Sequence, residues 1–417
     1  MSTCLVGSEM CIRDSLSITP TLSEEQALQY ALNSINAEVW AWEDDFLEEM
    51  LREDTQNDDA THYPTGELVI ISPELKRGIA TIESYRLAYK FDVFATEPMT
   101  RQEIYIDAQN GELVDSYSLI FNADVAATGN AHYSCENPVN ITASSIGSNY
   151  RLYDMARNIH TRTADNSWYT PNIDVTSNDT FFDENPNAVA VQYGTSQFYD
   201  YLLNVHQRNS IDGNGYKLKS WVNYKQNWNN AAWITGYAVF GDGDNQNYSA
   251  LTSIDIVAHE FTHGLTRRTA RLKYWGESGA LNEGISDIFG TLVEFYAEPD
   301  CADWLLGEDI VLQNGKTALR NMSNPNDATT TTQQPDTYGG DYWYNGWQDH
   351  GGVHINNGVL NYWFYLITNG GSGTNDNSYF YDITPLDNNI DVSRTKAAKI
   401  VFRSLTAYLS VFSQYDD

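Results

Sequence analysis

Basic residues are scarce in this chain of 417 residues. It has 24 Lys and Arg against 56 Asp and Glu, which gives a formal net charge of −32 at pH 7. A surface this acidic repels the phosphates of nucleic acids and the headgroups of anionic lipids. We therefore expect neither nucleic acid nor a membrane as a partner, and we expect a monomer.

Cysteine and long apolar runs are also scarce. Two of the four cysteines, Cys4 and Cys11, lie at the extreme N-terminus, which leaves Cys135 and Cys301. Sequence alone leaves open whether these two form a disulfide. No apolar run approaches the ~20 residues that a membrane-spanning helix needs.

The first 15 residues do not look like a native N-terminus. The segment from Cys4 to Ser15 resembles translated sequencing adapter, and it lacks the basic start and apolar core of a signal peptide. We exclude residues 1–15 from fold reasoning. We expect a secretion signal to precede Leu16 in the complete protein, and therefore an extracellular location.

Histidine is the third scarce residue type, with 8 in the chain, yet two of them share the motif His259-Glu260-Phe261-Thr262-His263. Two imidazoles one helical turn apart project from the same helix face, so one cation can bind to both. With one carboxylate from elsewhere they make a three-ligand zinc site that leaves a position for water, as catalytic zinc sites do.

A second acidic segment follows the histidine motif. Residues 253–266 are predicted to form a helix with an apolar stripe, and residues 281–297 a second helix. Glu283, Asp287, Gly290 and Glu294 recur at intervals of three and four residues along one side of the second helix. Because the other side is apolar and Gly290 permits close approach, we expect this acidic side to face cations inside the protein.

In motif, spacing and order, the chain from about Asn229 onward resembles the thermolysin family of zinc endopeptidases. The resemblance implies that His259, His263 and Glu283 bind zinc and that Glu260 is the general base. It also implies that Asp287 holds the remaining ring nitrogen of His259 and fixes its tautomer.

The same resemblance assigns groups that stabilise the transition state. The segment Asp349-His350-Gly351-Gly352-Val353-His354 is similar to the one that supplies the family's histidine, His354, oriented by Asp349. Tyr274, eleven residues after His263, falls where the family places a tyrosine hydroxyl beside the reacting carbonyl. His350 is a competing candidate; we prefer His354 because of the preceding Gly-Gly and the position of Asp349.

Substrate-binding residues are implied in the same way. Asn230 and Ala231 resemble an edge-strand segment that pairs with substrate backbone, and Arg320 matches the arginine that binds the substrate carbonyl beyond the scissile bond. The family's preference for a hydrophobic residue just after that bond would be set by Ile256 and Leu319.

Calcium is the second cofactor that the resemblance implies. The family's calcium carboxylates correspond to Asp255, Glu294, Asp303 and Glu308, and oxygen clusters of this kind suit hard divalent ions. One residue is inserted near Cys301, and Leu305 stands where the family often has an acid. One calcium ion and two calcium ions therefore both stay open.

The fold class expected is α+β. We expect a propeptide domain at residues 16–120, a β-rich lobe at 121–252 and a helical lobe at 253–417, truncated at its C-terminus, with substrate in the cleft between the lobes. Expected elements are a helical stretch over 24–51, for which a break near Asn36 stays open, strands at 85–94 and 103–106 with an Asn110-Gly111 turn, and helices at 188–206 and 397–409. Residues 329–334 and 370–376 are expected to form surface loops.

We conclude from sequence that the chain is the precursor of a secreted zinc metalloendopeptidase, which cleaves proteins and peptides at internal bonds. Its N-terminal domain, if a propeptide, inhibits the cleft until it is cleaved off near residues 121–128; an unrelated accessory domain is the alternative. The rival function is a zinc-containing protein that binds proteins or polysaccharides without catalysis. Glu260 argues against that rival, because a structural zinc needs no base beside it.

Overall fold

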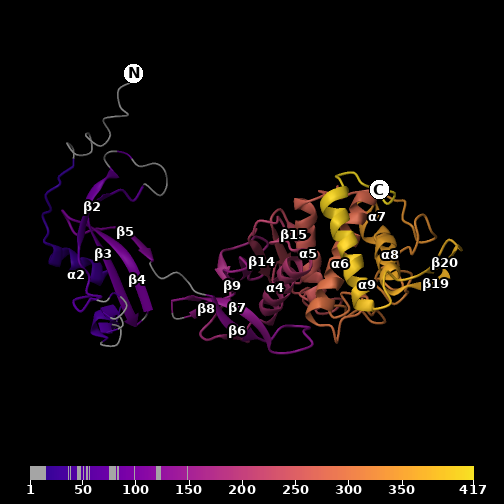
Figure 1. Ribbon diagram of the computed structural model, residues 1–417, viewed down its shortest axis with the longest axis horizontal. Helices are drawn as coiled ribbons and strands as arrows, with labels where there is room; N and C mark the ends of the chain where they lie inside the picture. The colour runs from indigo at the N-terminus through magenta and orange to yellow at the C-terminus, as the bar shows by residue number, and fades with distance from the viewer. Residues whose placement is uncertain are drawn as a thin grey trace, which may run out of the picture. The chain divides into compact units, whose positions relative to one another are not determined.

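The computed structural model describes residues 16–35, 37, 39–44, 48–49, 51–52, 55, 57–74, 81, 84–97, 99–118, 124–147 and 149–417. The chain divides into two units, residues 1–122 with 146–148 and residues 123–145 with 149–417. The adapter-like segment, with Cys4 and Cys11, and residues 121–123 of the expected cleavage region lie outside the described residues. Figure 1 labels the elements of both units.

The smaller unit packs one helix on an antiparallel sheet. Helix α2 (Glu24–Asn33) begins at Ser23, whose side chain accepts a hydrogen bond from the backbone of Gln26. The strands are β1 (Val39–Trp40), β2 (Glu67–Ile71), β3 (Arg86–Glu97), β4 (Met99–Asp107) and β5 (Leu113–Ser118), and both β1 and β2 pair with β3. Its core joins Leu28 of α2 to Phe91 and Ile104 of the sheet. The predicted turn is present, with Gly111 at φ 81° between β4 and β5.

The prediction of a helical stretch over residues 24–51 is wrong between Asn33 and Asp44, whereas residues 48–49 and 51 are helical. The chain forms β1 there, pairs it with the end of β3, and continues into a 3₁₀ turn, η1 (Ala41–Glu43). Trp40 stacks on Trp42 with ring centroids 5.0 Å apart. Pairing with a strand more than 50 residues away overrides the local acidic, helix-favouring composition.

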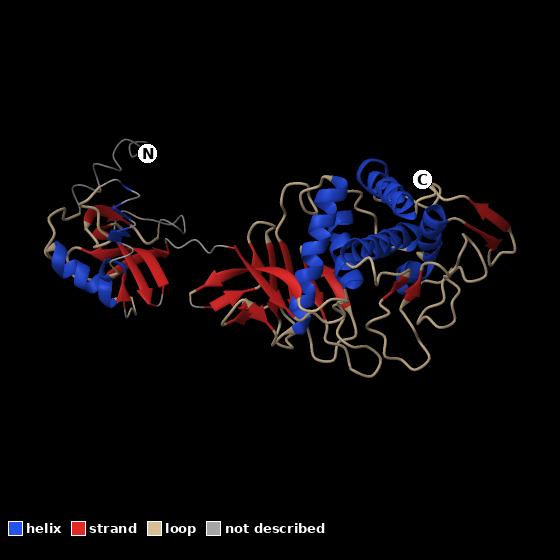
Figure 2. Ribbon diagram, turned by 60° about the horizontal axis from the view of Figure 1, so that its bottom comes forward, coloured by secondary structure: helices blue, strands red, loops and turns tan. Residues whose placement is uncertain are grey.

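The larger unit has strands at one end and helices at the other (Figure 2). One sheet has the order β12-β8-β7-β6-β13 and a second the order β11-β10-β14-β16-β15, with β9 paired to β10. Their bounds are β6 (Asp124–Gly129), β7 (Val139–Ile146), β8 (Asn149–Arg151), β9 (Tyr153–Asp154), β10 (Ile159–Thr163), β11 (Ile173–Asp174), β12 (Thr176–Ser177), β13 (Phe181–Phe182), β14 (Leu218–Val222), β15 (Ala231–Ile234) and β16 (Tyr237–Phe240). Strand β15 is therefore an edge strand.

Apart from α4, the helices of the larger unit follow residue 253. They are α4 (Pro186–His206), α5 (Ile254–Arg268), α6 (Gly276–Ala297), α7 (Asp349–Asn356), α8 (Gly358–Asn369) and α9 (Ile390–Arg403), with a π-helical turn η4 (Ser404–Tyr408). Two short hairpins pair β17 (Leu305–Leu306) with β18 (Arg320–Asn321), and β19 (Gly371–Thr374) with β20 (Phe380–Ile383). Within the described part of the chain, no helix is both long and apolar enough to cross a bilayer.

One hydrophobic core runs through both ends of the larger unit. Val257, Phe261 and Leu265 of the predicted apolar stripe of α5 are fully buried in it, and Ile254 at the start of the stripe is partly buried. Phe261 stacks on Phe198 of α4 with ring centroids 5.9 Å apart. The other side of α5, which carries the histidines, is thereby turned toward α6. The fold class expected from the sequence, β-rich and then helical, is confirmed.

Three helices begin earlier than predicted. Helix α4 starts with Pro186, which suits the first turn of a helix because its missing N–H would have no partner there. Helix α6 starts at Gly276 rather than Leu281, and α9 at Ile390 rather than Ala397, where Asn389 caps two backbone N–H groups. Helices α7 and α8 were not predicted.

The interpretation of residues 329–334 as a surface loop is wrong in part. Thr330 and Gln334 are fully buried. The Gln334 side chain donates to the backbone oxygen of His354 and to Asn357 Oδ1, at 2.8 and 2.6 Å. The segment thus supports the backbone between α7 and α8. Residues 371–374 form β19 of an exposed hairpin.

A disulfide joins Cys135 to Cys301 across 166 positions, with the Cα atoms 6.4 Å apart. Cys135 lies between β6 and β7, and Cys301 follows α6. Glu298 accepts hydrogen bonds from the Ser134 hydroxyl and from the Cys135 backbone N–H, at 2.5 and 3.1 Å. The bridge connects the β-rich end of the unit to the loop that carries Asp303 and Glu308.

Candidate active site

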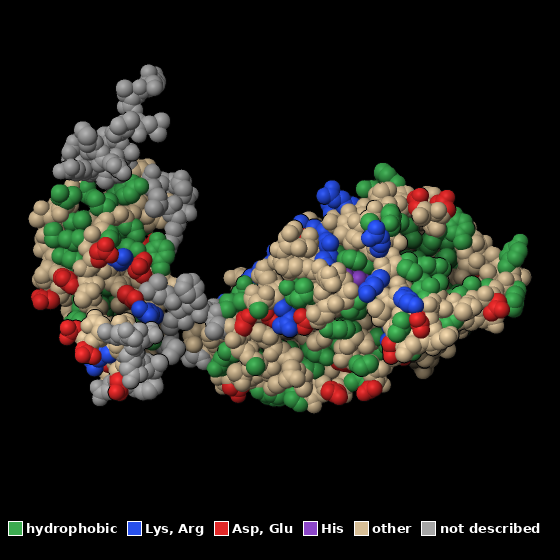
Figure 3. Space-filling view, viewed as in Figure 1, with side chains coloured by type: hydrophobic (Ala, Val, Ile, Leu, Met, Phe, Trp, Pro, Cys, Tyr) green, Lys and Arg blue, Asp and Glu red, His purple; other side chains and the backbone are tan. Residues whose placement is uncertain are grey.

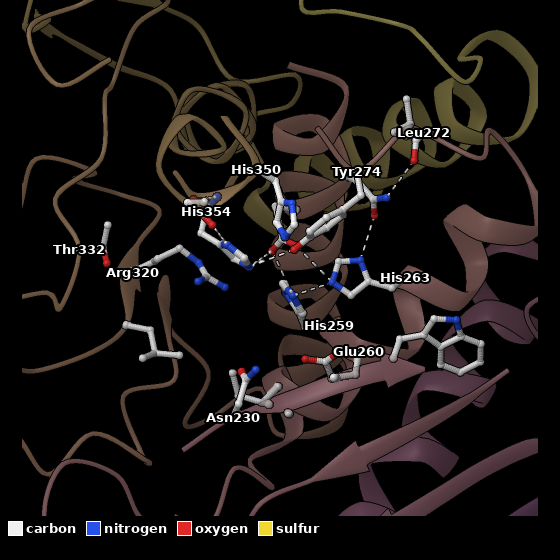
Figure 4. A pocket seen from close by; sticks show the side chains of 18 of the residues that line it. Asn230, His259, Glu260, His263, Leu272, Tyr274, Arg320, Thr332, His350 and His354 are labelled. Carbon is white, nitrogen blue, oxygen red and sulfur yellow. Dashed lines mark hydrogen bonds and ion pairs between the residues drawn. The ribbon is translucent and has the colours of Figure 1, made fainter. Parts of the chain in front are cut away.

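Helices α5 and α6 bring three metal-binding side chains to one point (Figure 4). The ligand atoms of His259, His263 and Glu283 all lie within 4.8 Å of one another. The two Nε2 atoms are 3.1 Å apart, and each is 3.4 Å from a carboxylate oxygen of Glu283. Glu283 is fully buried, and His259 is nearly so.

Charge explains why these groups fit a cation. Burial alone would raise the pKa of Glu283, but the imidazoles of His354, His263 and His259 outweigh it and hold the pKa well below its usual value. Two imidazole lone pairs 3.1 Å apart repel unless a proton or a metal lies between them. Glu283 Oε2 is buried with no hydrogen-bond partner among the described residues. Two nitrogens and one carboxylate make a donor set that suits zinc.

Each histidine is held through its other ring nitrogen. His259 Nδ1 lies 2.8 Å from Asp287 Oδ1, as expected from the resemblance. His263 Nδ1 lies 2.9 Å from Asn282 Oδ1 and 3.2 Å from Ser286 Oγ. We did not predict these last two residues. Each immediately precedes Glu283 or Asp287 on α6, and that repeated four-residue spacing was the available signal.

Asp287 is the most heavily bonded carboxylate of the site. Arg320 donates to it twice, from Nε at 2.7 Å and Nη2 at 2.6 Å. Asn357 and Asn361, at the start of α8, donate to its Oδ2 at 2.7 and 2.8 Å. Burial would raise the pKa of Asp287, but Arg320 and His259 outweigh it and lower the pKa. Arg320 also lines the cleft, and its pairing with Asp287 leaves Nη1 for a substrate.

Two hydrogen-bond donors, Tyr274 and His354, lie beside the metal-binding trio. Tyr274 lies just before α6; its hydroxyl donates to Glu283 and lies 3.1 Å from His354 Nε2. His354 Nδ1 lies 2.5 Å from Asp349 Oδ1, and its backbone N–H donates to Asp349 Oδ2 at 2.8 Å. Burial disfavours the charged form of His354, but Glu283 and Asp349 outweigh it and raise the pKa.

A left-handed turn at the start of α7 positions His354. Residues Asp349 to Gly352 have φ values of 51°, 51°, 89° and 80°. A side chain at Gly352 would meet Tyr344 at 2.7 Å, so glycine is required there. His350 lies on the same turn, and its ring is 5.5 Å from that of Tyr274. Of these two histidines, His354 is the one that lies within hydrogen-bonding distance of the Tyr274 hydroxyl and is paired with Asp349.

The trio lies in a cleft of about 1380 Å³. Glu260, Asn230, Ala231, Ile256, Leu319 and Arg320 all line it. Ala231 opens edge strand β15, whose free side offers backbone hydrogen bonds to an extended chain. In Figure 4, Arg320 and Thr332 lie on one side of the histidines and Leu272 on the other.

The carboxylates expected to bind calcium lie together behind α5 and α6. Burial raises the pKa of Glu294 and Glu308, and Asp255 raises both further. One oxygen of Glu294 and one of Glu308 are buried without a hydrogen-bond partner among the described residues. Asp309 was not predicted; burial and Asp255 raise its pKa to about 6. In the described part of the chain, only the His259, His263 and Glu283 group converges to within 4.8 Å, so these carboxylates are more widely spaced.

A β-rich lobe and a helical lobe, joined by a helix that carries the HExxH motif, define the zincin class of fold. Sequence profiles of the thermolysin metallopeptidase family match most of the larger unit, the catalytic domain at residues 126–267 and the alpha-helical domain at residues 270–417. The chain belongs to the thermolysin metallopeptidase family.

Individual relatives agree. A bacillolysin of Brevibacillus brevis is 35% identical over 403 residues, which cover 95% of this chain and 66% of the relative. A thermolysin of Alicyclobacillus acidocaldarius is 37% identical over 351 residues, 80% of this chain and 61% of the relative. This chain therefore spans less than two thirds of either relative. Among solved structures, the precursor of protealysin, a metalloproteinase from Serratia proteamaculans, is 29% identical with a TM-score of 0.51, covering 62% of this chain and 77% of that one.

Proposed function

We propose that this chain is a zinc metalloendopeptidase that hydrolyses internal peptide bonds of proteins and peptides. One observation carries the proposal: His259, His263 and Glu283 converge in an open cleft beside Glu260, Tyr274 and His354. A zinc site that served only structure would not need a carboxylate base beside it and two hydrogen-bond donors opposite.

His259, His263 and Glu283 would hold the zinc ion. When bound there, zinc supplies a Lewis acid that lowers the pKa of coordinated water to about 7. Asp287 keeps His259 in the tautomer whose Nε2 lone pair points to the metal position, and Asn282 does the same for His263. The chain's own residues supply the rest of the chemistry.

Glu260 is the general base in this proposal. It adjoins His259 on α5, lines the cleft, and accepts a proton from the attacking water before delivering it to the leaving amine. Tyr274 and protonated His354 donate hydrogen bonds to the oxyanion that forms on the carbonyl. The raised pKa of His354, maintained by Glu283 and Asp349, favours the protonated state that this donation needs.

The cleft fits an extended peptide. We assign Asn230 and Ala231 to backbone pairing with substrate, and Arg320 to the carbonyl beyond the scissile bond. Ile256 and Leu319 would then give a preference for a hydrophobic residue just after that bond. Both line the cleft with Arg320, and Leu319 directly precedes Arg320 in the chain, which supports this direction of binding.

The N-terminal unit is assigned as a propeptide, with domain bounds of 16–120, 121–252 and 253–417. The likeness to the protealysin precursor supports this assignment. As a propeptide it would inhibit the cleft until cut near residues 121–128. The Cys135–Cys301 disulfide supports secretion, because such bonds persist in oxidising compartments. Calcium is assigned to the carboxylates around Asp255, and the enzyme is assigned as a monomer that binds neither membranes nor nucleic acid.

Casein hydrolysis tests the proposal. The zinc-loaded protein, once cut between its N-terminal unit and the larger unit, should cleave casein, and a chelator should abolish cleavage. Glu260→Ala should lower turnover by about 100- to 10,000-fold while zinc content, measured by atomic absorption, stays at that of the unaltered protein. Zinc binding without cleavage by the unaltered, processed protein would overturn the proposal in favour of a non-catalytic binding protein.

A further inference from the structure

The segment from the end of α5 to the start of α6 holds a concentration of the chain's few cations. Of the 24 Lys and Arg residues, Arg267, Arg268, Arg271 and Lys273 fall between positions 267 and 273. Three of them, Arg267, Arg271 and Lys273, line the cleft and are exposed to solvent. We call these three the basic rim. On the face shown in Figure 3, Lys and Arg side chains (blue) surround a small exposed patch of histidine (purple).

The backbone of the basic rim is fixed from behind. Ala270 and Leu272 are buried, so the side chains between and after them, Arg271 and Lys273, are left outside. Arg271 has φ 57°, and its backbone N–H donates to Thr266 at 2.8 Å. The Lys273 backbone N–H donates to the Val411 oxygen at 2.8 Å. Because buried and exposed residues alternate in this anchored segment, the side chains of Arg271 and Lys273 are directed into the cleft.

The cations of the rim have no acidic partner of their own. In the described part of the chain, no carboxylate lies within 4.0 Å of Arg267, Arg271 or Lys273, although Asp and Glu outnumber Lys and Arg by 56 to 24. The helix dipole favours cations in the last turn of α5, which accounts for Arg267 and Arg268. It does not account for Arg271 and Lys273, which lie beyond the helix end.

The rim occupies the end of the cleft opposite Arg320. Leu272, which separates Arg271 from Lys273, lies beyond His263, while Arg320 lies on the far side of the histidines (Figure 4). Under the proposed function, Arg320 and Leu319 contact residues after the scissile bond. The rim must then face residues before it.

We propose that the basic rim selects substrates with Asp or Glu within about three residues before the scissile bond, a reach of roughly 10 Å in an extended chain. This inference rests on the proposed function and names its substrate class. Because the rest of the surface is acidic, an acidic substrate is attracted here and repelled elsewhere. If two or three cations lie about 6–8 Å from the substrate carboxylate in a solvated cleft, kcat/KM for the charged side chain should exceed that for a neutral one by about fivefold to tenfold at low salt.

Three matched peptides test whether the basic rim selects acidic substrates. Three internally quenched peptides carry Phe just after the intended scissile bond and differ only two residues before it, where they carry Glu, Gln or Lys. The measurement is the ratio of kcat/KM for the Glu and Gln peptides, which does not depend on the fraction of active protein. For the zinc-loaded protein after the cut near residues 121–128, the ratio should be about five to ten at low ionic strength and approach one at 1 M salt.

Substitutions in the basic rim test whether these cations cause the preference for the Glu peptide. Arg271→Gln with Lys273→Gln should bring the ratio toward one, and Arg271→Glu with Lys273→Glu should favour the Lys peptide. Arg268→Gln is the matched control, because Arg268 shares the last turn of α5 but stacks over Tyr216 at 4.2 Å and does not line the cleft. It should keep the ratio of the unaltered protein.

A ratio near one in the unaltered protein, or an unchanged ratio in the double variant, would overturn the inference while leaving the peptidase function standing. Failure to cleave even the Gln peptide would overturn the proposed function, and the substrate preference with it. The Gln peptide therefore separates the two failures.

Discussion

At the scale of single residues, Asp287 connects the site to the structure around it. Its two oxygens accept hydrogen bonds or ion pairs from His259, Arg320, Asn357 and Asn361, which come from three different parts of the chain. Arg320 is buried, so its charge needs this partner. The orientation of a metal-binding imidazole and the placement of a substrate-binding cation thus depend on one carboxylate.

Asp287→Asn should therefore lower both the affinity for zinc and the stability of the folded protein. We expect zinc affinity to fall about 10- to 100-fold, because the residues that orient metal-binding histidines typically contribute that much. We also expect a loss of stability of about 3 kcal/mol from the buried, unpaired guanidinium. Zinc competition against a chromophoric chelator and thermal unfolding measure the two effects.

Asp349→Asn serves as the control for Asp287→Asn, because Asp349 is also paired with a histidine, but one that lies outside the metal-binding trio. It should lower turnover and leave zinc affinity unchanged. Zinc affinity unaltered by Asp287→Asn would contradict the role given to Asp287.

Sequence predicted the residues whose positions follow from helix periodicity. His259, His263, Glu283 and Asp287 occupy regular helical spacings, so their convergence needs only that α5 and α6 pack together. Asn357 and Asn361 donate to Asp287 across 70 and 74 positions, and no local pattern signals such pairings. The residues that support the site are therefore the ones that sequence reasoning missed.

At the scale of elements, the approach of α5 to α6 is set by Gly290. A side chain there would meet the backbone oxygen of Asp255 at 2.6 Å, and backbone cannot yield as a side chain can. Sequence indicated this close approach, because Gly290 stands among carboxylates on one side of a helix. Sequence did not indicate that α6 begins at Gly276. Tertiary contacts outweigh the poor helix propensity of that first turn, since Ser278 bonds to the Ser413 backbone and Gly279 packs on Val353.

Gly290→Ala should destabilise the protein by about 2 kcal/mol, because overpacking costs more than the gain in helix propensity. Gly284→Ala on the same helix is the control; its new methyl group would meet the flexible side chain of Leu360 at 2.9 Å. We expect a clearly smaller effect there. Thermal unfolding of the zinc-loaded proteins measures both, and equal destabilisation would contradict the argument.

Three helices meet at His206. Its ring stacks on Phe402 of α9 at 4.1 Å and contacts Phe289 of α6 and Tyr201 of α4. Burial and, to a smaller extent, the charge of Lys399 lower the pKa of His206 to about 4. The ring therefore packs in its neutral form, and protonation must disrupt the junction of α4, α6 and α9.

Acid should destabilise this junction. The unfolded chain takes up the proton of His206 near pH 6.5, and the folded protein only near pH 4, so stability is lost as pH falls between these values. We expect a loss of about 2 kcal/mol between pH 7 and pH 5 that His206→Phe removes. Urea unfolding at both pH values measures it. His160, whose pKa is also lowered to about 4, is present in both proteins and cancels in the comparison.

At the scale of the whole molecule, one cross-link joins the β-rich and helical lobes, and one group of carboxylates joins α5, α6 and the segment after α6. The Cys135–Cys301 disulfide connects the β6–β7 loop to the segment that also carries Asp303, Glu308 and Asp309. Glu308 and Asp309 lie near Asp255 of α5, and burial, followed by the charge of Asp255, raises the pKa of both. Sequence left the disulfide open, because two cysteines 166 positions apart give no local signal of proximity.

Calcium should stabilise the molecule increasingly as pH rises. A carboxylate whose pKa is raised by folding keeps its proton to higher pH in the folded than in the unfolded state. Without calcium, stability therefore falls as pH rises above about 4, the usual pKa of a carboxylate. The groups concerned are Asp255, Glu294, Glu308 and Asp309. Calcium binds the charged form and only in the folded state, so it reverses this loss.

The measurement is the thermal midpoint after EDTA treatment, with zinc alone and with zinc plus calcium, at pH 6.5 and pH 8. Samples with and without calcium are compared at the same pH, so the titration of His206 cancels. We expect calcium to raise the midpoint by several degrees at pH 8, since about 2 kcal/mol corresponds to that shift, and by less at pH 6.5. Glu294→Gln with Glu308→Gln, which removes two of the repelling charges, should raise the calcium-free midpoint at pH 8 and abolish the calcium effect. Full stability restored by zinc alone at pH 8 would show that these carboxylates hold protons rather than calcium, and α5, α6 and the segment after α6 would then be held together by the hydrophobic core without help from a second cation.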